Sequence, residues 1–250
     1  MEPHRRVDML RGMASSEPDS QPRMHRGGKL SFRSRVQDKD DDPGDRLVFG
    51  GENPPPLGEL VPRGYDEVEI EIGPGKGAFV LAATEAKPGT FLLGIEAAPG
   101  YASLAATRLH HSGRTNGLFL VDNGKLFLQD RVPERALAAV HVYFPDPWPK
   151  RRHKGRRFFT DDVPAVLARA LRDDGFVYVA TDNAAYAGQI VRVLGSAVQF
   201  ERDPDQERRV LALGEGHAFT PTNFERKYIE EGRVIRRYAF RRVPRGEVSA

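Results

Sequence analysis

The chain has 250 residues, with 38 Lys and Arg against 35 Asp and Glu, and it contains no cysteine. The lack of cysteine excludes a disulfide framework and thiolate catalysis. No apolar run reaches the roughly 18–20 residues of a membrane span, and no apolar leader opens the chain. We therefore expect a cytoplasmic protein, in which the segregation of charge is more informative than the net charge of +3.

Residues 1–46 are polar, charged or rich in Pro and Gly, which predicts a disordered N-terminal arm before a domain over residues 47–250. Within the domain, short β-branched runs alternate with helical patterns. Strands are predicted at residues 68–72, 90–96, 117–123, 138–144, 176–183, 197–201 and 237–242, and helices at 77–86, 99–111, 161–175 and 184–194. This alternation predicts an α/β fold with an open, mostly parallel sheet.

Polar clusters come directly after five of the predicted strands: "GPGKG", Glu96, "DN", "FPDPW" and "TDN". In open parallel sheets, ligands bind outside the carboxyl ends of the strands. The five clusters are therefore expected to meet at one edge of the sheet and to form a single site.

The loop "EIGPGKGAF" places Gly73, Gly75 and Gly77 between a strand and a helix, so that the backbone can approach a ligand closely. It lacks the Ser or Thr of a phosphate-binding Walker loop and the spacing of the dinucleotide fingerprint. Glu71, before the loop, would repel a pyrophosphate, whereas Glu96 ends the next strand, where ribose-binding acids lie. The combination favours S-adenosylmethionine over NAD. A purely structural turn is the alternative.

The third strand ends in "VDNGKLFL", where Asp122 or Asn123 could reach the adenine edge of a cofactor. The spacing to the apolar pair that follows favours Asn123. A simple Asx turn is the alternative structural role for this residue.

The segment "FPDPW" forms a rigid corner, because Pro145 and Pro147 restrict the backbone on both sides of Asp146. A carboxylate held in one direction suits the N–H edge of a planar base. An enzyme that acts on a base in folded RNA must extrude it, and stacking on Trp148 could return about 1–3 kcal/mol. Ordinary packing is the alternative role for Trp148.

A polycation follows the corner, with six permanent cations in eight residues: Lys150, Arg151, Arg152, Lys154, Arg156 and Arg157. A solvated face is the usual role of such a run. Its position beside the predicted corner favours contact with a nucleic-acid backbone.

Together, "FPDPWPKRRHKGRR", "EIGPGKG", "GIE", "TDN" and "TNFERKY" resemble the bacterial tRNA (guanine-N7)-methyltransferase family over about residues 47–243. The resemblance implies a Rossmann-like class I methyltransferase with a seven-stranded, mostly parallel sheet and helices on both faces. It also implies methyl transfer from S-adenosylmethionine to N7 of guanine in tRNA, expected at position 46 of the variable loop.

The resemblance assigns roles to positions of this chain. The implied cofactor-binding residues are Glu71, Gly73, Gly75, Glu96, Asn123 and Asp146. Asp146 is the implied catalytic residue, in contact with both cofactor and base. The implied substrate-binding residues are Lys150, Asp182, Thr222, Asn223, Phe224 and Glu225. The implied RNA-binding residues are Arg152, His153, Lys154, Gly155, Arg156 and Arg157. The family often has Asp at the position given to Asn123.

The chemistry agrees with this assignment, because guanine N7 has an in-plane lone pair and no proton need leave before it attacks. We therefore expect neither a metal nor a strong base, while Asp146 can stabilise the positive charge that develops on the purine. The alternatives are a methyltransferase of the same fold acting on another RNA or a small molecule, a non-catalytic RNA-binding module, and an NAD-dependent dehydrogenase. The sequence leaves open whether the protein is a monomer or a homodimer.

Overall fold

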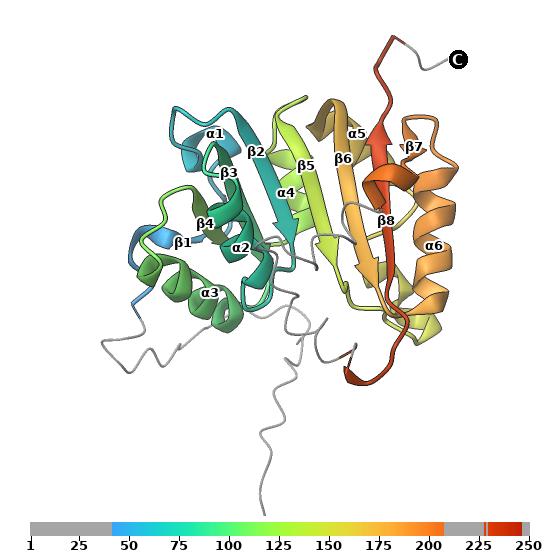
Figure 1. Ribbon diagram of the computed structural model, residues 1–250, viewed down its shortest axis with the longest axis horizontal. Helices are drawn as coiled ribbons and strands as arrows, with labels where there is room; N and C mark the ends of the chain where they lie inside the picture. The colour runs from blue at the N-terminus through green and yellow to red at the C-terminus, as the bar shows by residue number, and fades with distance from the viewer. Residues whose placement is uncertain (1–41, 208–227, 229, 247–250) are drawn as a thin grey trace, which may run out of the picture. The chain divides into compact units, whose positions relative to one another are not determined.

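The computed structural model describes residues 42–207, 228 and 230–246 (Figure 1). Most of the predicted arm and the segment Thr222–Glu225 lie outside these residues. The domain boundary at residue 47 stays a prediction; the short 3₁₀ turn η2, Gly44–Arg46, comes directly before the first strand.

One eight-stranded sheet, in the order β1-β4-β3-β2-β5-β6-β8-β7, organises the described residues. Its strands are β1 Leu47–Phe49, β2 Glu67–Ile72, β3 Thr90–Glu96, β4 Gly117–Val121, β5 Leu137–Tyr143, β6 Leu171–Thr181, β7 Phe200–Arg202 and β8 Arg236–Arg242. The pairs from β1 to β6 are parallel, and β8 is antiparallel to both of its neighbours. The predicted mostly parallel sheet is confirmed, but the count of seven is corrected by β1, which is too short to give a periodic signal.

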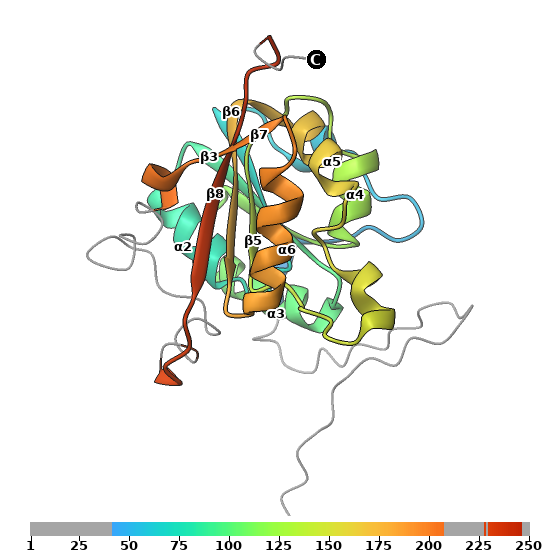
Figure 2. The ribbon, with the colours of Figure 1, turned by 90° about the vertical axis from the view of Figure 1, so that its right-hand side faces the viewer.

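Helices cover both faces of the sheet. They are α1 Leu57–Leu60, α2 Ala78–Ala86, α3 Pro99–His111, α4 Gly124–Asp130, α5 Val163–Ala170 and α6 Ala184–Gly195, with the 3₁₀ turn η3 at Arg151–Arg156. Phe79 of α2 and Ala105 of α3 pack with Phe119 on one face. The larger core lies on the other face, beneath α1, α4, α5 and α6, and Figure 2 shows α2 on the opposite side of the sheet from α4, α5 and α6. Within the part of the chain that the structure describes, no helix has the length and apolar character needed to cross a membrane.

The predicted helix over residues 161–175 is wrong at its end, because α5 stops at Ala170 and Leu171 already pairs with Leu137 in the sheet. In a longer helix, the carbonyl of Ala168 would accept from the backbone N–H four residues on. Instead it accepts from Arg242 Nε at 3.1 Å and from Arg245 Nη2 at 3.0 Å. Side chains from the end of the domain thus set this boundary, and no local sequence signal marks it.

A buried network of hydrogen-bonded side chains connects the centre of the sheet to the end of β5, directly before the predicted "FPDPW" corner. The Glu69 carboxylate, 4% exposed, accepts from Lys87 Nζ at 2.8 Å and lies 3.0 Å from His141 Nε2. Nδ1 of His141 lies 2.9 Å from the Tyr143 hydroxyl. Burial lowers the pKa of His141, so we assign a neutral ring that donates to Glu69 and accepts from Tyr143. Burial acts to raise the pKa of Glu69, but the bonds to His141 and Lys87 prevail and bring it to about 2.

The hydrogen-bonded network of Glu69, His141 and Tyr143 predicts a loss of stability in acid. The pKa of Glu69 falls from 4.5 to about 2 on folding. The contribution of Glu69 to the free energy of unfolding is therefore complete above pH 4.5 and is lost as the pH falls toward 2. At 1.36 kcal/mol per pKa unit the contribution is about 3 kcal/mol. The pKa of His141 is also lowered from its ordinary value of 6.5. Below pH 6.5 this histidine therefore binds a proton more readily in the unfolded chain than in the folded protein, which lowers the free energy of unfolding. Urea unfolding measured from pH 3 to pH 7 should show both effects.

The variant Glu69→Gln should be less stable at pH 7, and its free energy of unfolding should change less between pH 4.5 and pH 3 than that of the wild type. Glu85→Gln is the matched control, because the Glu85 side chain on α2 is 60% exposed. Identical pH profiles for wild type and Glu69→Gln would contradict the assignment.

Candidate active site

The polar clusters that follow β2, β3, β4, β5 and β6 lie at one edge of the sheet. These five strands are mutually parallel, so their carboxyl ends share that edge, to which the arrowheads of β2, β5 and β6 point in Figure 1. From β2 the chain moves to β3 and β4 on one side and returns to β5 and β6 on the other. This reversal of strand order is where open α/β sheets form their binding crevices.

The glycine loop after β2 adopts backbone angles that favour glycine. Gly73, Gly75 and Gly77 have φ values of 70°, 54° and 74°. A Cβ at Gly77 would lie 2.8 Å from both Ala105 Cβ and Phe119 Cζ, whereas a Cβ at Gly73 would meet open space. Gly77 thus allows helix packing, and Gly73 leaves the backbone accessible to a ligand.

Glu96, the last residue of β3, links the glycine loop to the turn that follows β3. One carboxylate oxygen accepts from the backbone N–H of Gly75 at 3.0 Å, and the other accepts from that of Ala98 at 2.9 Å. Burial raises the pKa of Glu96, and the charge of Asp146 raises it further. The side chain is therefore pre-oriented and electrostatically coupled to the corner after β5.

Glu71 supplies a buried acceptor beneath the loop. It is 2% exposed, and the backbone N–H of Val80 in the first turn of α2 is a hydrogen-bond partner of the carboxylate. Burial raises its pKa well above the ordinary range, and the charge of Glu96 adds to the rise. Its Oε2 has no hydrogen-bond partner among the described residues. An unpaired buried carboxylate oxygen suits a cationic ligand group, so the site fits the ammonium and sulfonium charges of S-adenosylmethionine.

The structure distinguishes between Asp122 and Asn123. Oδ1 of Asn123 caps α4, accepting from the backbone N–H groups of Lys125 at 3.1 Å and Leu126 at 3.3 Å. Asp122 uses Oδ1 to accept from the N–H of Asn123, and its Oδ2 is buried without a partner in the described part of the chain. The cofactor role of Asn123 stays a prediction, while Asp122 holds the oxygen that is still free to accept.

The acidic corner after β5 is held in an uncommon backbone conformation. Phe144 and Trp148, on either side of the Pro-Asp-Pro segment, have φ values of 49° and 38°. Such conformations cost about 1–3 kcal/mol each and persist where surrounding structure enforces them. Asp146 itself is exposed at this corner. One neighbour of the Trp148 ring is the Arg156 guanidinium, 5.0 Å from its centroid.

The polycation does not present one uniform surface. Among the residues of this run whose side chains the structure describes, Lys150, Arg152, Lys154, Gly155 and Arg156 are exposed. His153 is half-buried, edge-on to Trp148; its pKa is lowered by desolvation and by the nearby cations. Arg157 is only 6% exposed, which is at odds with the predicted RNA contact of this residue. The run turns inward at Arg157 because η3 ends there and places this side chain against α6.

After β6, Asp182 lies at the same edge but already has a charged partner. Its carboxylate accepts from Arg233 Nη1 at 2.8 Å, and Arg233 also pairs with Glu231. The Arg233 guanidinium lies 4.4 Å from the ring centroid of Tyr228. Sequence reasoning missed Arg233, which has no motif around it. The structure places Lys150 at the start of η3, whereas Thr222–Glu225 lies outside the described residues.

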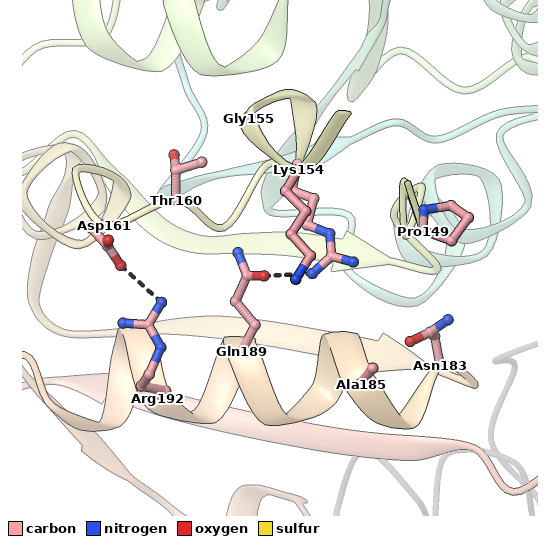
Figure 3. A pocket seen from close by; sticks show the side chains of 10 residues that line it. Pro149, Lys154, Gly155, Thr160, Asp161, Asn183, Ala185, Gln189 and Arg192 are labelled. Atoms are coloured by element: carbon pink, nitrogen blue, oxygen red, sulfur yellow. Dashed lines mark hydrogen bonds and ion pairs between the residues drawn. The ribbon is translucent and has the colours of Figure 1, made fainter. Parts of the chain in front are cut away.

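A cationic groove of about 660 Å³ leads away from the corner between η3 and α6 (Figure 3). Lys154, Thr160 and Asp161 line one wall, and Asn183, Gln189 and Arg192 line the other. Arg192 forms an ion pair with Asp161 at 3.0 Å. The groove adds Arg192 to the positive surface, which the sequence pattern did not indicate.

Comparison with known proteins identifies the family. Residues 66–238 match the model of a family described as "Putative methyltransferase". The chain is 32% identical over 195 residues to the tRNA (guanine-N(7)-)-methyltransferase of Nitrosomonas eutropha. The aligned region covers 76% of this chain and 82% of that protein. This chain belongs to the tRNA (guanine-N7)-methyltransferase family.

Other similarities agree with membership in the tRNA (guanine-N7)-methyltransferase family. The relative from Rhodopseudomonas palustris is 35% identical over 191 residues, covering 75% of both chains. Among solved structures, the 16S rRNA methyltransferase KamB aligns with a TM-score of 0.50 at 15% identity, over 74% of this chain and 92% of that one. That likeness shows the fold, a class I methyltransferase sheet. The resemblance inferred from the sequence is therefore confirmed.

Proposed function

We propose that this chain transfers a methyl group from S-adenosylmethionine to N7 of guanine in tRNA, at position 46 of the variable loop. Family membership supports the reaction. The observation that carries the site is that Glu71 and Glu96, beneath and beside the glycine loop, share one sheet edge with Asp146 and the exposed cations of η3. Because the substrate is tRNA, we place the enzyme in the cytoplasm.

The cofactor would be held by the loop between β2 and α2. Glu71 would accept from its ammonium group through Oε2, which has no partner within the described part of the chain, and Glu96 would accept from the ribose hydroxyls. Asp122, together with Asn123, would face the adenine. When bound, S-adenosylmethionine supplies an electrophilic methyl group on a sulfonium.

The corner would hold the target guanine by the carboxylate of Asp146. N7 attacks with an in-plane lone pair, so Asp146 need not remove a proton. Its negative charge instead stabilises the positive charge that appears on the purine, and much of the rate comes from holding the two reacting atoms in line. Lys150 and Asp182 would position the nucleotide from either side of the corner, and Thr222–Glu225 would contact it from the C-terminal part of the chain.

The exposed cations would bind the RNA backbone. Arg152, Lys154 and Arg156 would supply the positive charge on η3, with His153 and Gly155 between them, and Arg192 extends the charged surface across the groove in Figure 3. Each phosphate neutralised by a cation contributes roughly 0.7–0.9 to the slope of log affinity against log salt concentration.

The groove leads to a prediction for RNA binding. Lys154→Ala and Arg192→Ala should each raise the KM for tRNA several-fold and reduce the salt slope of tRNA binding by roughly 0.7–0.9. Arg172→Ala is the matched control, because Arg172 is an exposed cation at the start of β6, paired with Glu67. A filter-binding titration at several salt concentrations measures the slope. Unchanged slopes in both groove variants would show that RNA does not enter the groove.

The proposed function itself is tested by incubating the protein with labelled S-adenosylmethionine and an unmethylated tRNA transcript, then mapping the product by nuclease digestion and mass spectrometry. We expect N7-methylguanosine at position 46 and none in a transcript with adenine there. Methylation of another RNA alone would refute the tRNA assignment. A different methylated position in tRNA would refute only the assignment to position 46.

A further inference from the structure

Arg157 is the last cation of "KRRHKGRR", yet it is buried while its neighbour Arg156 is exposed. A buried guanidinium is unfavourable unless its N–H groups are hydrogen-bonded. The partners of Arg157 therefore show what this side chain does in the molecule.

Those partners belong to the acidic corner and to α6. Nε donates to the carbonyl of Pro147 at 2.7 Å, and Nη1 donates to Oε1 of Gln189. The guanidinium lies 4.8 Å from the ring centroid of Tyr186. Gln189 also donates to the carbonyl of Phe159 at 2.6 Å, and the Tyr186 hydroxyl accepts from the backbone N–H of Phe159. The cluster joins α6, the corner and the chain after η3.

The Pro-Asp-Pro segment of the corner has few backbone groups that can donate a hydrogen bond. Pro145 and Pro147 have no backbone N–H, so a hydrogen bond to either residue must be accepted by its carbonyl. The bond from Arg157 reaches the carbonyl of Pro147, directly after Asp146. Before the corner, the N–H of Phe144 donates to Ala180 at 2.7 Å. Asp146 is thus held between an anchor on β6 and an anchor through Arg157.

We propose that Arg157 is a positioning residue for Asp146 and not a phosphate contact. This inference rests on the proposed function, because it concerns the orientation of the carboxylate that would hold the target guanine. Arg157 acts through the Pro147 carbonyl, so its geometry matters as well as its charge. A lysine keeps the charge but cannot reproduce the planar, fork-shaped donor set that reaches Pro147 and Gln189 together.

The test compares Arg157→Lys, Arg157→Ala and Arg156→Ala with wild type. For both Arg157 variants we expect kcat for tRNA methylation to fall by about 10²-fold, the loss that a misplacement of about 1 Å can cause. Their salt slope of tRNA binding should stay at the wild-type value, and kcat is compared at a cofactor concentration that saturates each variant. Arg156→Ala should instead raise the KM for tRNA and reduce the salt slope by roughly 0.7–0.9.

Two results would overturn the inference: a reduced salt slope in Arg157→Ala, or a wild-type kcat in Arg157→Lys. If the alanine variant does not fold, the lysine variant decides, since its aliphatic stem can still pack on Tyr186. Thermal unfolding and cofactor binding monitor the fold. A wild-type protein that leaves tRNA unmethylated would refute the proposed function instead. The salt slope needs no turnover and would then still decide whether Arg157 contacts phosphate.

Discussion

Replacing Asp146 by alanine is expected to lower kcat for methyl transfer to tRNA by about 10²–10³-fold, the usual loss when one preorganised electrostatic partner of a transition state is removed. The carboxylate lies on a corner whose backbone is restricted by two prolines and held by the anchors at Ala180 and Arg157. Asp146→Asn should be nearly as impaired, because the amide keeps the shape but loses the charge. Single-turnover methylation with labelled cofactor measures the chemical step directly.

The affinity of the Asp146 variants for S-adenosylmethionine is measured separately, so that a loss of cofactor binding can be told apart from a loss in the chemical step. The charge of Asp146 helps to raise the pKa of Glu96, so its removal makes Glu96 easier to ionise and should leave that carboxylate competent to bind. Asp130→Asn, at the exposed end of α4, should behave as wild type. An Asp146→Ala variant that retains most of its kcat would show that the corner does not take part in the reaction.

Replacing Glu96 by alanine is expected to weaken S-adenosylmethionine binding by about 100-fold or more. The carboxylate accepts from the N–H groups of Gly75 and Ala98, and hydrogen bonds to charged groups contribute about 1.5–3 kcal/mol each. The variant loses the brace of the glycine loop and also the acceptor proposed for the ribose. Isothermal titration calorimetry with the cofactor or its demethylated product measures the loss.

Glu96→Gln separates shape from acceptor capacity. The amide NH₂ of glutamine would face one of the two backbone N–H groups that Glu96 now accepts from, so this variant should also bind weakly. Glu85→Gln, exposed on α2 and paired with Arg114 in the wild type, should bind normally. Wild-type affinity in Glu96→Ala would show that the ligand does not depend on this end of β3.

The carboxylates of the site explain why a cationic ligand would be selected. Glu71 and Glu96 both have raised pKa values, because burial disfavours their charge and each has a neighbouring carboxylate. Bringing positive charge to the glycine loop would relieve this repulsion and would lower both pKa values. A dinucleotide would bring its negative pyrophosphate to the same place, so the geometry disfavours the NAD-dependent alternative.

The sequence by itself determined the parts of the fold that depend on local signals. The strand Thr90–Glu96 and the helix Pro99–His111 have the predicted bounds, because a Pro-Gly pair precedes the strand and Pro99 is a preferred first residue of a helix. The positions of the polar clusters followed from the same alternation, since parallel strands bring their carboxyl ends together. Motif spacing was sufficient to recognise the glycine loop and the corner.

Only the tertiary structure decided where individual side chains point. Arg157 turns inward because Gln189, 32 residues away in the sequence, accepts its hydrogen bond. The helix before β6 ends early because Arg245 is hydrogen-bonded to its last turn from 77 residues away. Asn123 caps a helix, whereas Oδ2 of Asp122 has no hydrogen-bond partner among the residues that the structure describes. Composition and periodicity report an average environment, whereas the partner of a polar side chain is set by residues that become neighbours only when the chain is folded.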